Sequence, residues 1–322
     1  MPSFEDGLDA ELGAALAKFP ALPDFADAPA ARQALADLMA KYPRVPNTSG
    51  VVIEDRMIPG PEGAPQVRVR IFRPAAGAKD LPGLCYMHGG GYIVGTPEAE
   101  DDPVCHIVRE VGCVAISVDY RLAPEHKAPA AVEDCYAALK WMYANAVALG
   151  IDARRIAIGG RSAGGGLAAG LALLARDRKA INPAVKPVFQ MLIYPMIDDR
   201  TAVAVGAAVS DPRVWNHGHN ERAWKHYLTT TPGGPDTLPY AAPSRALDLR
   251  GLPPAYIAIG EAEVFLPENV AYAQRLKEAG VSTELHVFPG AFHGWEGSLP
   301  AAAISQRAIN ERVAVLKRAF KV

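Results

Sequence analysis

The sequence has few of the features that define several large classes of protein. Only four cysteines occur in 322 residues, too few for a disulfide-stapled secreted scaffold. The formal net charge of -2 gives no broad basic surface for nucleic acid or an anionic membrane. No apolar run approaches the roughly 18 residues of a membrane span, and residues 1–20 are acidic where a signal peptide is basic. We therefore expect a cytoplasmic protein without nucleic-acid or membrane partners, whose cysteines are buried free thiols.

The sequence does have a regular alternation of short apolar runs and helical patterns. A β-hairpin is expected first, from residues 51–58 and 67–74, and six further apolar runs follow. The helical stretches between and after these runs are 100–111, 130–148, 163–177, 268–279 and 303–320. This order predicts an α/β fold with a mostly parallel, eight-stranded sheet and helices on both faces. Catalytic residues are then expected beyond the carboxyl ends of the strands.

Two segments do not fit this alternation. Helical patterns at 8–19 and 29–41 precede the first strand, and about 60 residues rich in Pro, Trp and His separate two late strands. We expect residues 1–45 to form an N-terminal helical cap segment. Residues 46–322 would be the catalytic domain, with a cap insertion at about 199–245 that packs against the N-terminal helices.

One serine lies in a glycine-rich turn between a predicted strand and a predicted helix. Gly160-Arg161-Ser162-Ala163-Gly164 fits the G-x-S-x-G pattern, and its setting is the one that this pattern needs. Glycines let the strand and the helix approach closely, while Ser162 takes a strained backbone conformation. A plain glycine turn is the alternative. The setting predicts that Ser162 is a nucleophile.

A second glycine cluster ends an earlier predicted strand. The amides of Gly89, Gly90 and Gly91 follow His88 there and could face a developing oxyanion, with the amide of Ala163 as a further donor. A flexible turn is the alternative interpretation. His88 itself is expected to brace the loop through hydrogen bonds to backbone.

A serine nucleophile needs a base, and the position of His293 suits that role. His293 follows the last predicted strand on a glycine-flanked loop, whereas His286 lies within that strand and is expected to be a core or edge residue. Three histidines at 217, 219 and 226 could suggest a metal site, but no regular carboxylate spacing accompanies them. We expect no metal.

Taken together, the chain resembles the hormone-sensitive-lipase-like carboxylesterases, the bacterial family IV of the α/β-hydrolase superfamily, over nearly its whole length. The stretches that carry the resemblance are "MHGGGYIVGTPE", "SVDYRLAPEHKAPAAVEDC", "GGRSAGGGLAAGLAL", "YPMIDD", "AAPSRALDLRGLPPAYIAIGE" and "VFPGAFHGWE". The resemblance implies hydrolysis of carboxylic esters without a metal or organic cofactor, a helical cap, and a homodimer in many members. Short, soluble acyl esters are the expected substrates.

Two departures from the family pattern stand out. Members usually carry Asp or Glu before the serine, where this chain has Arg161. The triad acid is usually the Asp of a "DPLxDE"-like segment, and here the matching segment places Glu263 in that position. A longer carboxylate can still orient the histidine. The other candidate acids are Glu261, on the same loop, and the pair Asp198 and Asp199.

Three further expectations concern surroundings and function. Asp119, Arg121 and Glu125 are expected to form a charge network that fixes the loop after their strand. A ligand-binding protein on a hydrolase scaffold is an alternative function; the plant gibberellin receptors resemble this family and lack the histidine that His293 matches. An amidase or acyltransferase with the same triad is a further alternative that the sequence does not separate.

Overall fold

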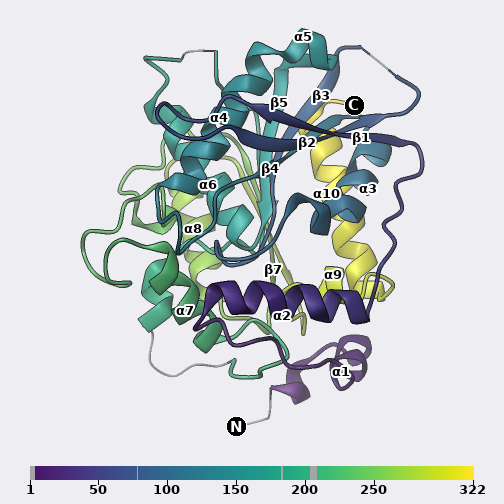
Figure 1. Cartoon of the computed structure of the whole chain (residues 1–322), viewed down its shortest axis with the longest axis vertical. Coiled ribbons are helices and arrows are strands. Elements are labelled where there is room, and N and C mark those ends of the chain that lie inside the picture. Colours follow the sequence, from purple (N-terminus) through teal and green to yellow (C-terminus); the bar gives the residue numbers. More distant parts are fainter. Residues whose placement is uncertain (1–3, 78, 183, 204–208) are drawn as a thin grey trace.

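An eight-stranded sheet forms the centre of the molecule in the computed structural model, which describes residues 4–77, 79–182, 184–203 and 209–322 (Figure 1). The strands are β1 (Val51–Ile58), β2 (Val67–Pro74), β3 (Leu81–Met87), β4 (Val114–Asp119), β5 (Ile151–Arg161), β6 (Gln190–Ile193), β7 (Ala255–Gly260) and β8 (Thr283–Phe288). Their order is β1-β2-β4-β3-β5-β6-β7-β8. Only β2 runs antiparallel to its neighbours, and the other described pairs are parallel. The predicted hairpin and mostly parallel sheet are confirmed.

The burial of each strand follows from its place in the sheet. Every residue of β6 and β7 is buried, as expected where helices cover both faces of a sheet. The edge strand β8 differs, because only its last residue is buried. His286 lies on β8 with a half-buried side chain between Glu284 and Glu311. It is an edge residue, within the expectation stated for it.

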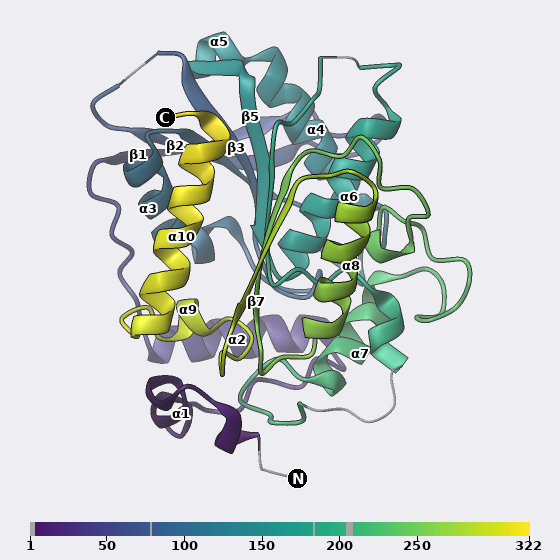
Figure 2. The same cartoon turned by 180° about the vertical axis from the view of Figure 1, so that it is seen from behind.

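Helices pack on both faces of the sheet. The α-helices are α1 (Ala10–Leu16), α2 (Ala28–Lys41), α3 (Asp101–Val111), α4 (Ala130–Ala144), α5 (Ala146–Leu149), α6 (Ala163–Asp177), α7 (His217–Tyr227), α8 (Leu266–Glu278), α9 (Trp295–Ser298) and α10 (Ala303–Phe320). Short 3₁₀ helices are η1 (Glu5–Gly7), η2 (Pro97–Glu100), η3 (Asp199–Val203) and η4 (Pro243–Arg245). Helices α3 and α10 cover one face, and α4, α6 and α8 cover the other (Figure 1, Figure 2).

Two expected helices are shorter than predicted. The helix expected at 130–148 is interrupted at Asn145, whose side-chain amide and backbone amide both donate to the Trp141 carbonyl, a local bonding pattern that favours helix ends. The helix expected at 8–19 is only α1. It begins after Asp9, whose carboxylate caps the amides of Glu11 and Leu12, and it ends before Pro20, which disfavours helix in the preceding residue.

The N-terminal segment and the stretch before β7 meet beyond the carboxyl ends of the parallel strands. Helices α1, α2 and α7 lie together at that end of the sheet (Figure 1, Figure 2). The Leu22 amide donates to the Pro212 carbonyl at 2.8 Å, and His226 Nε2 donates to the Phe25 carbonyl at 3.0 Å. Residues 204–208 of the expected cap insertion lie outside the described residues. The described parts of the two segments therefore cover the edge where catalytic side chains are expected.

Two further expectations concern thiols and membranes. Cys85, Cys105, Cys113 and Cys135 are all buried and free. In the described ranges, no helix has both the length and the hydropathy that crossing a bilayer requires.

The turn from β5 into α6 brings backbone into contact with backbone. A Cβ on Gly160 would lie 2.6 Å from the carbonyl oxygen of Met87, at the end of the neighbouring strand β3. A Cβ on Gly164, in the first turn of α6, would press on the Met87 and His88 carbonyls and lie 2.6 Å from the Met87 carbonyl carbon. Real Cβ atoms do not approach backbone so closely. Both glycines of the G-x-S-x-G pattern are therefore required by packing.

Replacing Gly164 by alanine tests this requirement. We expect Gly164→Ala to lower the free energy of unfolding by about 3 kcal/mol, because the added methyl group overpacks a site bounded by backbone. Gly13→Ala in α1 is the matched control, since the nearest atom to its added Cβ is 3.6 Å away. That change should stabilise slightly, as alanine favours helix over glycine. Denaturant unfolding of both variants measures the difference, and equal stabilities would contradict the packing argument.

Candidate active site

Ser162 lies at the sharp turn between β5 and α6. Its backbone has φ 56° and ψ -125°, a conformation that residues with a side chain rarely adopt. The turn is held by hydrogen bonds, because the Ser162 amide donates to the Ile193 carbonyl at 2.8 Å and its own carbonyl accepts from the Gly166 and Met196 amides. Hydrogen bonds to β6, to the residues after it and to α6 thus hold Ser162 in this strained conformation. The turn places the Ser162 hydroxyl beyond the carboxyl ends of the strands.

His293 is brought to Ser162 by the loop that follows β8. The distance from His293 Nε2 to Ser162 Oγ is 2.9 Å, although 131 positions separate the two residues. Glycines at 290 and 294, with φ of 66° and 75°, let this loop turn back toward the sheet edge. The ring is nearly buried.

Glu263 meets the other side of the same ring from the loop after β7. Its Oε2 lies 2.9 Å from His293 Nδ1. This arrangement assigns the tautomer: Nδ1–H donates to the carboxylate, and Nε2 is left to accept the Ser162 hydroxyl proton. Burial raises the pKa of Glu263, and the positive charge that His293 carries when protonated lowers it. Burial is the larger effect.

The rival carboxylates are engaged elsewhere. Asp198 forms an ion pair with Arg200 at 2.6 Å. Asp199 is bound by Arg245 and by the hydroxyl of Thr237. Glu261 accepts a hydrogen bond from the Gly290 amide at 3.1 Å. Of the four acids considered, only Glu263 contacts His293.

Aromatic side chains surround the His293 ring. Tyr194 and Phe265 meet it edge-on, with ring centroids 4.7 and 5.2 Å from that of His293, and Trp215 is tilted at 6.3 Å. Sequence reasoning missed all three. Tyr194 and Phe265 follow predicted strands, a signal that could have found them, whereas Trp215 belongs to the irregular stretch and carried no such signal. These contacts restrict the orientation of the His293 ring, whose side chain is only 10% exposed.

The glycine loop after β3 lies directly against Ser162. Gly90 and Gly91 have φ of 124° and 59°, so both need glycine. A Cβ on Gly89 would be 3.5 Å from Ser162 Cβ. The Gly89 amide points toward Glu100 Oε1 at 3.4 Å, while the amides of Gly90, Gly91 and Ala163 have no hydrogen-bond partner within the described residues. The structure thus separates Gly89 from the other three expected donors.

His88 braces this loop. Its Nδ1–H donates to the Gly89 carbonyl at 2.8 Å, and its ring stacks on Tyr120 at a centroid distance of 4.2 Å. The Tyr120 hydroxyl donates to the His88 carbonyl at 2.9 Å. Burial lowers the pKa of His88, which favours the neutral ring.

The three cap histidines do not converge. His226 donates to the Phe25 carbonyl, and the His219 ring packs edge-on against Phe25 with centroids 5.0 Å apart. Burial lowers the pKa of His217 and of His219. Over residues 4–77, 79–182, 184–203 and 209–322, no group of three or more His, Cys, Asp or Glu side chains could hold a metal ion.

The predicted network of Asp119, Arg121 and Glu125 is wrong. Arg121 pairs with the buried carboxylate of Asp134 at 2.8 Å, from helix α4. Asp119 pairs instead with Arg68 at 2.9 Å, and Glu125 with Arg32 at 2.7 Å. Each of the three residues has its partner on a different element. The Glu125 pair ties the loop after β4 to the N-terminal helix α2.

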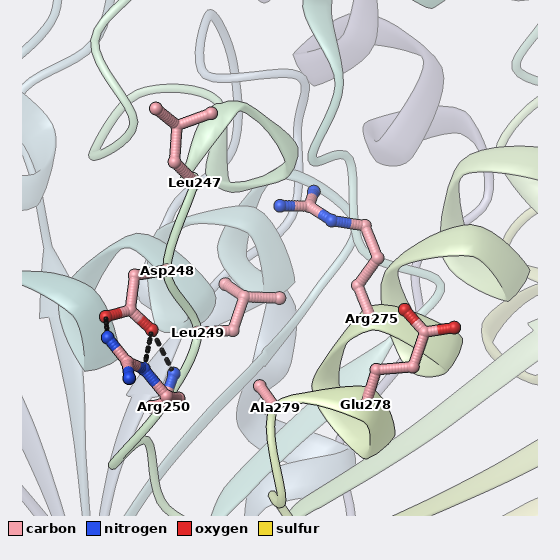
Figure 3. Close-up of a pocket in the computed structure, with 7 residues that line it drawn as sticks. All are labelled: Leu247, Asp248, Leu249, Arg250, Arg275, Glu278 and Ala279. Carbon is pink, nitrogen blue, oxygen red and sulfur yellow. Dashed lines mark hydrogen bonds and ion pairs between the residues drawn. The ribbon is translucent and has the colours of Figure 1, made fainter.

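A surface hollow lies between the segment before β7 and the end of α8 (Figure 3). Its lining residues are Leu247, Asp248, Leu249, Arg250, Arg275, Glu278 and Ala279. None of them belongs to the Ser162, His293 and Glu263 group. Figure 3 shows Asp248 and Arg250 paired with each other at its rim.

Comparison with known proteins shows the family of the chain. The profile of a family described as "alpha/beta hydrolase fold" matches residues 84–297. The chain belongs to this family. Carboxylesterase NlhH of Mycobacterium tuberculosis is 36% identical over 271 residues, which cover 83% of each chain. An ethyl acetate hydrolase of Pseudomonas putida is 34% identical, with 70% of each chain covered.

A solved structure extends the likeness to the whole chain. The structure titled "Bacterial Heroin Esterase" superimposes with a TM-score of 0.92 and 41% identity, covering 99% of this chain and 100% of that one. The family match and these relatives show that the chain is a hormone-sensitive-lipase-like carboxylesterase of the α/β-hydrolase superfamily, as the sequence resemblance implied. Its activity is carboxylic ester hydrolysis.

The raised pKa of Glu263 gives a testable pH dependence. The folded state holds the Glu263 proton more tightly than the unfolded chain does, so stability from this group is full below its ordinary pKa of 4.5 and is lost as pH rises toward the folded value. Glu263→Gln removes this titration. We expect the unfolding temperature of Glu263→Gln to rise relative to wild type as pH increases above about 4.5. Thermal scans across a pH series measure the difference, and a constant or shrinking difference would contradict the assignment.

Proposed function

We propose that this chain is a serine carboxylesterase that hydrolyses short-chain esters through an acyl-enzyme intermediate. Ser162 is the nucleophile, His293 the base and Glu263 the triad acid. The observation that carries the proposal is the continuous hydrogen-bonded chain from Ser162 Oγ through both nitrogens of His293 to Glu263, with 2.9 Å at each step. The order of nucleophile, acid and base along the sequence is that of α/β-hydrolases.

The geometry supports the following steps. His293 Nε2 accepts the hydroxyl proton while Ser162 Oγ attacks the ester carbonyl carbon, and the ring becomes cationic. Glu263 stabilises that cation from Nδ1. The protonated His293 then gives its proton to the leaving alcohol, and the acyl group remains on Ser162. Water repeats the sequence and releases the acid.

The oxyanion of the tetrahedral intermediate needs donors that are not already engaged. The amides of Gly90, Gly91 and Ala163 meet this condition, since none has a partner in the described part of the chain, and we propose them as the oxyanion donors. The Gly89 amide faces Glu100 instead. Gly89 therefore supports the loop. Of the four amide donors expected from the sequence, it is the one that we do not propose as an oxyanion donor.

We assign the described residues within 1–45 and 199–245 to a cap that limits the acyl group. Trp215 from the second segment lies directly over the glycine loop, because a Cβ on Gly91 would be 2.5 Å from its ring. Phe25 from the first segment packs against Trp215 with centroids 5.4 Å apart. Ser162 is only 6% exposed beneath them. This aromatic cover over Ser162 supports short acyl chains, and the relative named as an ethyl acetate hydrolase is consistent with this substrate class.

Substitution of the two candidate acids tests the triad. We expect Glu263→Gln to fold and to lose about three to four orders of magnitude in kcat on an aryl acetate, because the wrong His293 tautomer is then favoured. Asp198→Asn, the control, should stay within a few-fold of wild type. Unchanged turnover in Glu263→Gln together with collapse in Asp198→Asn would move the acid to the loop after β6.

A covalent probe provides the second control. A serine-directed fluorophosphonate should label the wild-type protein, and Ser162→Ala should neither label nor hydrolyse. A folded wild-type sample that never labels at Ser162 would favour the alternative of a ligand-binding protein on a hydrolase scaffold.

Acyl preference is tested by a panel of aryl esters with one common leaving group. We expect kcat/KM on acetyl to hexanoyl esters to exceed that on the palmitoyl ester by more than about tenfold, because the proposed cap with Trp215 and Phe25 limits the length of the acyl group. Ser162→Ala, run in parallel, supplies the background rate. Equal hydrolysis of long and short chains would refute the small acyl site.

A further inference from the structure

Arg161, the residue before the nucleophile, does not act alone. Its Nε donates to Glu100 Oε1 at 2.6 Å, and the Glu100 side chain is only 2% exposed. Burial of the guanidinium lowers the pKa of Arg161, but the charge of Glu100 raises it, and the result lies well above the ordinary value. Arg161 and Glu100 thus form a charged, largely buried ion pair beside Ser162.

Glu100 also touches the glycine loop. The Oε1 atom that accepts from Arg161 accepts from the Gly89 amide at 3.4 Å, and Oε2 accepts from the Tyr86 hydroxyl at 3.2 Å. Tyr86 belongs to β3, the strand that leads into the glycine loop. One carboxylate therefore links the turn that carries Ser162, the loop that carries Gly90 and Gly91, and the strand beneath that loop.

The two linked segments are the ones whose relative position matters for an oxyanion. A Cβ on Gly89 would lie 3.3 Å from the Arg161 carbonyl oxygen, so loop and turn are in backbone contact. Donor amides stabilise an oxyanion only when they lie about 2.7–3.1 Å from the position it occupies. A shift of the loop against the turn would move Gly90 and Gly91 away from the carbonyl that Ser162 attacks.

The charge at position 161 is matched to that at position 100. An acid at 161, the usual residue of the resembling family, would here place two carboxylates together in a largely buried space. A neutral residue would leave Glu100 buried without a cation, which is strongly unfavourable. Nearby, Glu296 has its own cation, since Arg312 donates to Glu296 Oε1 at 2.8 Å. Arg161 is thus the cation that Glu100 requires.

We propose that the Glu100–Arg161 ion pair is a positioning element of this esterase: it fixes the Gly90 and Gly91 amides relative to Ser162. The proposal rests on the function proposed above. Neither residue is assigned a contact with substrate, so their effect on the rate passes through the oxyanion donors.

The test compares four variants. Arg161→Met and Glu100→Gln remove one partner each, the double variant Glu100→Gln/Arg161→Met removes both charges and leaves none buried alone, and Arg161→Lys keeps the pair. Asp248→Asn/Arg250→Met is the matched control, because it deletes the exposed ion pair of Figure 3, whose closest atoms are 2.7 Å apart. Each folded variant is assayed on an aryl acetate and with a trifluoromethyl ketone, which forms an oxyanion adduct with a serine nucleophile.

We expect the double variant to lose about 10- to 100-fold in kcat with KM changed less than about threefold, because misplacement of donors acts on the transition state. The Ki of the trifluoromethyl ketone should rise by a similar factor. Each single variant that folds should lose as much, since each removes the same pair. Arg161→Lys should recover most of the activity, and the control should match wild type.

Two results would overturn the proposal. One is a folded double variant with wild-type kcat and wild-type inhibitor affinity, even if Arg161→Met alone fails to fold; the pair would then serve folding only. The other is a loss in Arg161→Lys as large as that in the double variant. These results differ from those expected if the chain is not a serine esterase. In that case the wild-type protein would neither hydrolyse the acetate nor react with a fluorophosphonate at Ser162.

Discussion

The backbones of β3, β5 and α6 meet at a single point, and the site depends on this contact. Gly160 and Gly164 leave no room for a side chain against the carbonyl groups of Met87 and His88. This close approach lets one turn present Ser162 and the next loop present peptide amides within the reach of one small carbonyl group. A looser junction would separate nucleophile and donors by the width of a side chain, which a catalytic site built on hydrogen-bond distances does not tolerate.

Buried carboxylates surround that junction, and each has a different partner. Glu100 has Arg161, and Glu296 has Arg312 together with the hydroxyl of Tyr194. Each of these two acids has a permanently charged arginine beside it. Glu263 has only His293, whose charge depends on its proton. This difference affects how well each carboxylate can stabilise a protonated histidine. A permanent cation already offsets the negative charge of Glu100 and of Glu296, whereas the negative charge of Glu263 gains a neighbouring positive charge only when His293 is protonated.

The sequence predicted the parts of the site that strand ends determine. Ser162, His293 and the glycine loop each follow a strand with a clear apolar pattern, and parallel strands end at one edge of the sheet. The same rule could not choose between Glu263 and Asp198, because both follow strands that end at that edge. The choice depends on which loop approaches His293, and that depends on contacts between loops.

Long charged side chains were the least predictable element. Arg161 reaches a partner 61 positions away, and Asp119, Arg121 and Glu125 each pair outside their own loop. One partner in each of these pairs is an arginine. Its flexible stem can reach several elements, so proximity in the sequence carries little information about which carboxylate it binds. The interruption at Asn145 also involves a polar side chain, whose amide donates to the Trp141 carbonyl in addition to the Asn145 backbone amide, although the pattern alone continued.

Loop contacts also explain how a glutamate at position 263 reaches His293, where the resembling family has an aspartate. The Ala262 amide donates to the Ala291 carbonyl at 3.0 Å, and Glu261 binds the Gly290 amide, so the loops after β7 and β8 are joined on either side of the triad pair. These bonds set the separation between the backbone of Glu263 and that of His293 before any side chain is considered. Phe265, from the same loop, packs on the ring that Glu263 orients. With the loops joined in this way, the Glu263 side chain spans the remaining distance and places Oε2 2.9 Å from His293 Nδ1.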